Sequence, residues 1–133
     1  MDGASLAALA GMRALLLTVV AAVTACTDHT LPEDTAYRRL FDRFDSEAQC
    51  IAEGDFSVCY QTLTLCESGL VRLDLANWPK TGEYRLFDGR TAVAEFIDMQ
   101  LEFDLETRTS VELPGRHPWE EVHPLLHDCA PGR

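Results

Sequence analysis

Lysine is nearly missing from this 133-residue chain, in which Lys80 is the single lysine beside ten arginines. Acidic residues outnumber basic ones 22 to 11, and the formal net charge is −11 with no basic stretch. A chain of this charge is repelled by phosphate backbones, so we expect no nucleic-acid partner. Long hydrophobic runs are also missing: the longest, residues 14–23, is shorter than the roughly 20 residues that span a bilayer. The hydrophobic content of 47% nevertheless predicts a folded domain.

Residues 12–26 show the order of positive charge, apolar run and small-residue junction that is typical of a secretory signal. Arg13 precedes the apolar run, which ends in Val23-Thr24-Ala25-Cys26. This ending resembles the lipobox of bacterial lipoproteins, with Val23 standing where that family usually has leucine. The resemblance covers only residues 1–26. It implies that the signal is cut before Cys26 and that Cys26 is the lipid attachment site.

The domain organisation follows from this junction. We expect a signal peptide at residues 1–25, a lipidated tether at 26–34, and a single domain at 35–133. The initiator is Met12, or the signal has a long leader that begins at Met1. The protein would then lie in the bacterial cell envelope, anchored to the membrane by lipid and facing the periplasm or the cell exterior. Cleavage after Ala25 without lipidation is the alternative. The mature chain keeps 21 acids and 10 bases, so its charge stays at −11.

Four cysteines remain for the domain: Cys50, Cys59, Cys66 and Cys129. An even number in a small exported domain predicts two disulfides, and the spacing lacks the Cys-x-x-Cys pairs of zinc sites. Residues 58–66 read as one strand, which would separate Cys59 from Cys66 by roughly 23 Å, too far for a bridge. The pairs are therefore 50–59 with 66–129, or 50–66 with 59–129. A turn at residues 53–55 favours the first.

The mature sequence predicts a mostly β domain, a small antiparallel meander or partly closed barrel of about six strands. The expected strands are residues 58–66, 71–75, 84–87, 91–96, 99–105 and 109–113, and residues 77–82 are expected to form a loop. Asp88-Gly89 is the clearest hairpin signal. Apolar residues at three- and four-residue steps between Thr35 and Ile51 predict a short N-terminal helix. Pro118 predicts a short C-terminal helix over residues 118–122.

Patterns for catalysis and metal binding are weak. His123 and His127 have helical ligand spacing, but Pro124 disfavours a helix there, and His117 lies apart. Carboxylate pairs such as Asp42 with Asp45, or Glu102 with Asp104, alternate with apolar residues and are typical of faces in water. No serine elbow, phosphate-binding glycine loop or Cys-x-x-Cys redox pair is present. We therefore expect no catalytic residues, no metal and no cofactor.

The remaining hypothesis is a non-catalytic binding or scaffolding module for an envelope protein or polymer. Trp78 and Trp119 are the candidate partner-binding residues, because tryptophan is enriched in binding hot spots; the alternative is that each ring caps the core. A small barrel that carries a lipophilic or small-molecule ligand is the first alternative function. Side chains such as Leu63, Leu73, Phe96, Leu101 and Phe103 are expected to fill its narrow interior. An envelope enzyme is the second alternative.

Overall fold

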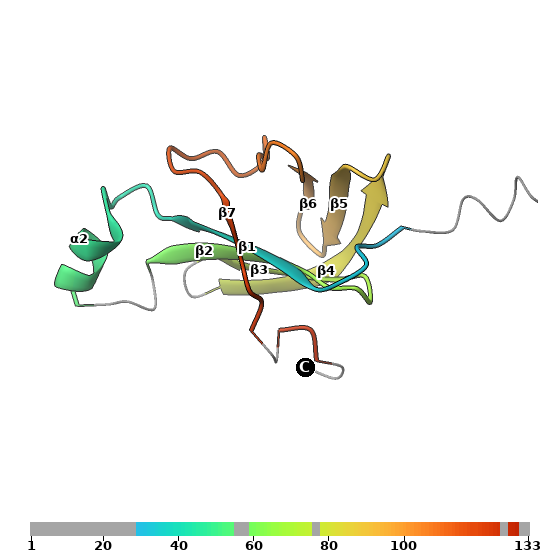
Figure 1. The fold of residues 1–133 in the computed structure, drawn as a ribbon, viewed down its shortest axis with the longest axis horizontal. Helices are drawn as coiled ribbons and strands as arrows, with labels where there is room; N and C mark the ends of the chain where they lie inside the picture. The colour runs from blue at the N-terminus through green and yellow to red at the C-terminus, as the bar shows by residue number, and fades with distance from the viewer. Residues whose placement is uncertain (1–28, 55–58, 76–77, 126–127, 131–133) are drawn as a thin grey trace, which may run out of the picture.

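A computed structural model describes residues 29–54, 59–75, 78–125 and 128–130. Within these ranges the chain forms one antiparallel sheet of seven strands that curls into a half-barrel (Figure 1). The strands are β1 (Thr35–Leu40), β2 (Tyr60–Leu65), β3 (Leu70–Leu75), β4 (Trp78–Phe87), β5 (Thr91–Phe96), β6 (Gln100–Asp104) and β7 (Glu120–Val122). One short helix, α2 (Glu47–Ala52), lies between β1 and β2.

Strands β2 to β6 form the predicted meander, in which each strand pairs with the next one along the chain, and β1 extends it by pairing with β2. The β4–β5 connection is the hairpin predicted at Asp88-Gly89. Both residues have positive φ, 54° and 65°, as a two-residue turn of this hand requires. Gly69 (φ 94°) does the same for the turn between β2 and β3. The alternating strands and their turn residues were therefore predicted correctly in the middle of the chain.

The C-terminal part of the chain returns to the other end of the sheet, where β7 pairs with β1. Strand order is β6-β5-β4-β3-β2-β1-β7, and no ladder joins β6 to β7 among the strands that the structure describes. The sheet is thus partly closed. Residues 105–119 cross from one edge to the other (Figure 1). At the β6 edge, the Glu102 N–H donates to the Glu112 carboxylate over 3.3 Å.

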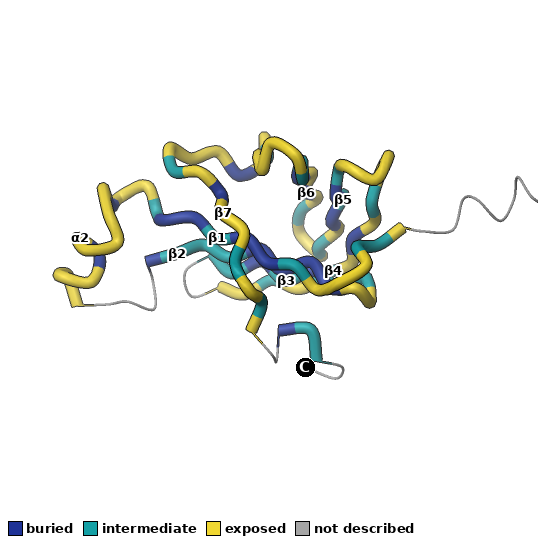
Figure 2. Tube along the Cα trace, in the orientation of Figure 1, coloured by how far each residue is buried: buried dark blue, intermediate teal, exposed yellow. Residues whose placement is uncertain are grey.

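The core lies on the concave face of the sheet, and buried residues alternate with less buried ones along β3, β5 and β6 (Figure 2). Phe103 is 1% exposed and contacts the rings of Tyr37 and Trp119, with centroids 4.9 and 5.9 Å away. The interior is filled as expected, because four of the five predicted side chains are buried and the fifth, Phe96, packs against them. The four are Leu63, Leu73, Leu101 and Phe103.

The predicted N-terminal helix is wrong over its first half. Thr35–Leu40 is strand β1, which pairs with β2 through six consecutive residues. The three- and four-residue spacing of the aromatic residues arose from a strand followed by a turn at residues 41–46. Only α2 is helical, and it begins where the Ser46 hydroxyl accepts the Gln49 N–H over 3.1 Å.

The predicted C-terminal helix is also wrong, because Glu120–Val122 is strand β7. Backbone pairing with residues 36–38 of β1 outweighs the helix-start signal of Pro118. Residues 109–113 form no strand: Thr109 makes one isolated bridge to Asp104, and Val111 is almost fully exposed. The alternation of Thr109, Val111 and Leu113 predicted a last strand at the edge of the sheet, and this prediction is wrong.

A loop was predicted at residues 77–82, but residues 78–82 form the first half of β4, and residue 77 lies outside the described residues. Proline is tolerated there because β5 pairs with β4 only from Gly82 onward. The Tyr84 N–H donates to Gly69 on the β3 side, so by alternation the Pro79 nitrogen faces away from β3. At Gly82 a side chain would overlap the carbonyl oxygen of Glu95, so β4 and β5 approach each other closely there.

In the described part of the chain, no helix is long and apolar enough to cross a membrane.

Candidate functional site

The predicted lipid attachment site, Cys26, lies outside the described residues and stays a prediction. The second part of the expected tether, residues 29–34, is bonded to the domain. The His29 carbonyl accepts the Leu86 N–H over 2.6 Å, and the Leu31 N–H donates to the Tyr84 hydroxyl over 3.1 Å. The Asp34 carboxylate accepts the Glu67 N–H over 2.8 Å. The chain is therefore already bonded to the domain at His29, six residues before β1.

Two disulfides are present, and their pairing is the favoured one of the two alternatives. Cys50 of α2 bonds to Cys59, with 5.8 Å between their Cα atoms. Both are buried with Leu40 and Phe44 in a second small cluster, away from the main core. This bridge fixes the only helix of the described chain to the end of the sheet.

The second disulfide joins Cys66, after β2, to Cys129 near the C-terminus, across 63 residues. Asp34 lies beside this bridge, close enough that the three residues resemble a ligand cluster. The two sulfurs are bonded to each other, however, and the Asp34 carboxylate already accepts a backbone N–H. The bridge therefore ties the C-terminal segment to the sheet near the point where the N-terminal segment enters.

Trp119, one of the two candidate partner-binding residues, belongs to the core and is 4% exposed. Its ring meets Phe103 edge-on, and the Arg39 guanidinium lies 4.7 Å above it. Its Nε1–H has no hydrogen-bond partner among the described residues. This placement corrects the expectation of a surface anchor at Trp119 and matches the alternative that the ring caps the core.

Trp78, the other candidate, is 76% exposed at the start of β4. Two positions along the strand, Lys80 forms an ion pair with Asp98 in the β5–β6 turn, and the adjacent Ile97 is fully exposed. These residues with Pro79 are hereafter the Trp78 surface. Within the described chain, Trp78 to Lys80 have register partners in β3 and none in β5. Thus one exposed aromatic ring lies at this end of β4, beside a stretch of the strand that is paired only with β3.

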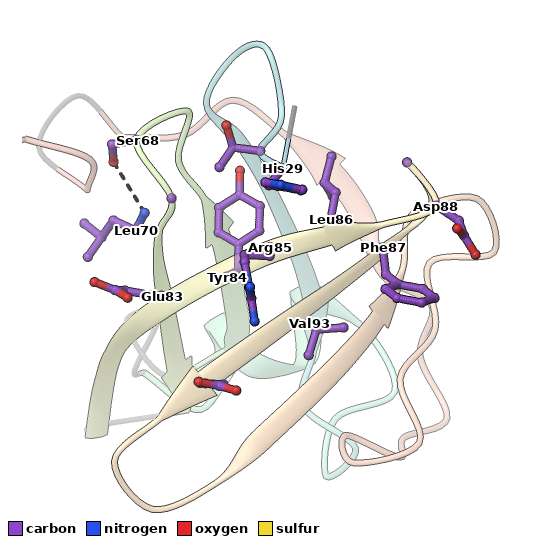
Figure 3. A pocket seen from close by; sticks show the side chains of 14 residues that line it. His29, Ser68, Leu70, Glu83, Tyr84, Arg85, Leu86, Phe87, Asp88 and Val93 are labelled. Carbon is purple, nitrogen blue, oxygen red and sulfur yellow. Dashed lines mark hydrogen bonds between the residues drawn. The ribbon is translucent and has the colours of Figure 1, made fainter. Parts of the chain in front are cut away.

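An open groove of about 1240 Å³ runs along the other half of β4 (Figure 3). Charged and apolar side chains are mixed on its walls, which come from the N-terminal segment, the β2–β3 turn and strands β3 to β5. They include Leu70, Glu83, Arg85, Phe87, Val93 and Glu95. The groove lies beside the filled core, so a ligand here would be held against the surface of the sheet.

The two C-terminal histidines that the structure describes, His117 and His123, form no common site. His117 shares a hydrogen bond of 2.7 Å with the Phe44 carbonyl, His123 is exposed, and His127 lies outside the described residues. Asp42 and Asp45 both bind Arg116, through its backbone N–H and its guanidinium, respectively. Their role is to hold the 113–117 loop against the turn after β1.

Asp104 is the carboxylate with the most strongly altered pKa. The backbone N–H of Thr107, then the Arg90 side chain and the backbone N–H of Glu106, lower this pKa to about 2. The carboxylate is partly exposed, and its backbone partners lie in the turn after β6. The lowered pKa is therefore explained by the hydrogen bonds with which the Asp104 carboxylate stabilises this turn.

Sequence reasoning missed the buried cation Arg39 and the entry of the chain at His29. Arg39 lies inside the half-barrel and donates to Gln61, Leu113 and Pro114. Arg39 follows Arg38 directly, and nothing in the sequence distinguishes the buried arginine from its less buried neighbour. For His29, the only available signal was its short distance in sequence from β1.

These features define a mostly β, disulfide-bonded antiparallel half-barrel with a filled interior. Searches against protein-family models, curated proteins and solved structures find no match to the chain. The functional assignment therefore depends on the residues themselves.

Proposed function

We propose that this protein is a lipid-anchored component of a bacterial cell envelope whose domain binds a protein or envelope-polymer partner without catalysing a reaction. The anchor is the acylated Cys26. The observation that carries the binding role is the 76% exposure of Trp78 at the end of a strand that is paired on one side.

The chemistry of the Trp78 surface fits an extended segment of a partner. Indole is a large, rigid contact group, and its burial in a complex contributes strongly to affinity. By strand alternation the Pro79 C=O faces away from β3, and Trp78 to Lys80 have no register partner in β5, so this side of the strand can accept an added strand. The single lysine, Lys80, already has its charge matched by Asp98.

The anchor and the binding surface are tested separately. Intact-mass analysis of the protein from native membranes should show loss of residues 1–25 and a gain of acyl mass, and Cys26→Ser should abolish both. A Cys26→Ser protein that keeps the acyl mass would contradict the anchor.

For the surface, photo-crosslinking from position 78 in intact cells should capture a defined partner, and the same crosslinker at Ile51 on α2 should capture none. Equal capture from both positions would contradict the binding role.

The carrier alternative has one supporting observation, the groove beside β4, because the interior itself is filled. Native mass spectrometry of protein from its source distinguishes the two functions. A retained small molecule that Phe87→Ala releases would favour the carrier.

A further inference from the structure

The chain enters the domain along the second half of β4. Beyond Glu83, β4 is no longer paired with β3, and residues 29–31 take over that side. The Leu86 N–H donates to the His29 carbonyl, and the Leu31 N–H donates to the Tyr84 hydroxyl, which in turn donates to the Cys66 carbonyl over 2.7 Å. The entering chain is thus fixed beside the end of β4, next to the β4–β5 hairpin (Figures 1 and 3).

This entry point limits where the lipid can be. Only Thr27 and Asp28 separate Cys26 from His29. Three residue steps span at most about 11 Å, compared with roughly 28 Å if all eight residues from Thr27 to Asp34 were free. Given the proposed lipidation of Cys26, on which this inference rests, the hairpin end is held close to the bilayer.

The hairpin carries side chains that suit the surface of a bilayer. Phe87 is 66% exposed and is adjacent in sequence to Leu86, whose N–H binds His29. Arg85 is exposed and forms no ion pair with any residue that the structure describes. The hairpin itself, residues 85–91, contains two cations, Arg85 and Arg90, and one anion, Asp88. Arg90 is offset by Asp104 and Glu106, which leaves Arg85 to meet lipid phosphates.

The opposite end of β4 carries Trp78. Ten residues of strand have a contour length of about 30 Å. Helix α2 also lies away from the entry of the chain, at the far end of the molecule (Figure 1). An exposed aromatic ring therefore occurs at each end of the same strand, one beside the anchor and one remote from it.

We propose that the β4–β5 hairpin is the membrane-facing end of the domain, with Phe87 inserted at the boundary between headgroups and acyl chains and Arg85 at the phosphates. The Trp78 surface is then directed away from the membrane. One strand separates the lipid-contacting residue from the partner-binding residue.

Tryptophan fluorescence in vesicles with brominated acyl chains tests this orientation. Lipidated full-length protein is reconstituted with Trp78→Phe in all variants, so that an introduced indole is the only exposed one. Phe87→Trp is compared with Ile51→Trp on α2, a matched exposed position at the far end. We expect bromolipid to quench Phe87→Trp at least twofold more than Ile51→Trp. Unfolding curves should show that both variants are folded.

The possible failures are distinguishable. If intact mass shows no acylation, the proposed anchor is wrong. If the protein is acylated and vesicle-bound but both variants are quenched equally, or Ile51→Trp more, the orientation alone is wrong. A third sample is lipidated protein that carries a brominated acyl anchor and is kept free of vesicles. If Phe87→Trp is quenched as strongly in this sample as in the vesicles, the protein's own acyl chain occupies the groove. Contact of Phe87 with the bilayer is then disproved.

Discussion

The guanidinium of Arg39 lies 4.7 Å over the indole ring of Trp119, and both side chains are buried inside the half-barrel. The same guanidinium donates to the Leu113 carbonyl over 2.7 Å and to the Pro114 carbonyl over 3.1 Å. Burial lowers the pKa of Arg39, and the charge of Asp42 opposes this shift. Arg39 of β1 thus holds residues 113–119, the last part of the segment that crosses between the sheet edges, over the core.

Arg39→Lys should destabilise the domain although it keeps the charge. An ammonium cannot reproduce the planar fork that meets Gln61, Leu113 and Pro114 together. Loss of one buried hydrogen bond with an unsatisfied acceptor costs about 1–3 kcal/mol. Urea unfolding measures the change, with the exposed Arg85→Lys as a control. Equal stability of the two variants would show that the fork is unimportant.

The two tryptophans should separate function from stability. Trp119→Ala removes a core ring and should lower the free energy of unfolding by about 3–5 kcal/mol. Trp78→Ala removes an exposed ring, and its effect on stability should stay within about 0.5 kcal/mol while partner capture weakens. Thermal unfolding and crosslinking are compared in each variant. A large loss of stability for Trp78→Ala would assign that ring to the fold instead of a binding surface.

The two disulfides should contribute unequally to stability. In the chain-entropy model, the 63-residue separation of Cys66 and Cys129 corresponds to about 4 kcal/mol. The separation of 9 residues between Cys50 and Cys59 corresponds to about 2.5 kcal/mol. The double variants Cys66→Ser/Cys129→Ser and Cys50→Ser/Cys59→Ser are compared by chemical unfolding, and non-reducing peptide maps check the pairing. The opposite order of stabilities would contradict the model.

Asp104 should give the domain a pH-dependent stability in acid. Its pKa is lowered to about 2 in the folded protein from an ordinary 3.8, so the unfolded chain binds its proton first. The contribution is fully present above about pH 4 and is lost as the pH falls through about 2. Asp104→Asn should lower the melting temperature at pH 7 and flatten its fall between these limits. Glu83→Gln is the control for removing one exposed negative charge, and an unchanged acid slope in Asp104→Asn would rule out this role.

The sequence predicted well wherever period-two alternation and turn residues agree. Leu63 and Leu65, with the returning Val71 and Leu73, face one side on both strands, and Gly69 supplies the turn. Asp88-Gly89 did the same for β4 and β5. In these places a local pattern and the pairing of adjacent strands lead to the same answer.

The errors occur where distant segments pair. Strand β1 is stabilised by β2 and β7, and β7 lies 80 residues or more along the chain, so the helix-like spacing at Tyr37, Leu40 and Phe41 is overridden. Trp119 looked like Trp78 in sequence because both adjoin proline, and only the return of the chain across the sheet buries one of them. Burial of Arg39 depends on that same crossover.

The Glu112 carboxylate, which accepts the Glu102 N–H at the β6 edge, has a consequence for copies of the molecule that meet at high concentration. A backbone N–H at an open sheet edge is a template on which the strand of a neighbouring copy can add. Here a charged side chain of the same molecule occupies it, and an approaching strand would also meet the negative charges of Glu102 and Glu112. The molecule therefore carries its own protection against edge-to-edge aggregation, on the side where its barrel stays open.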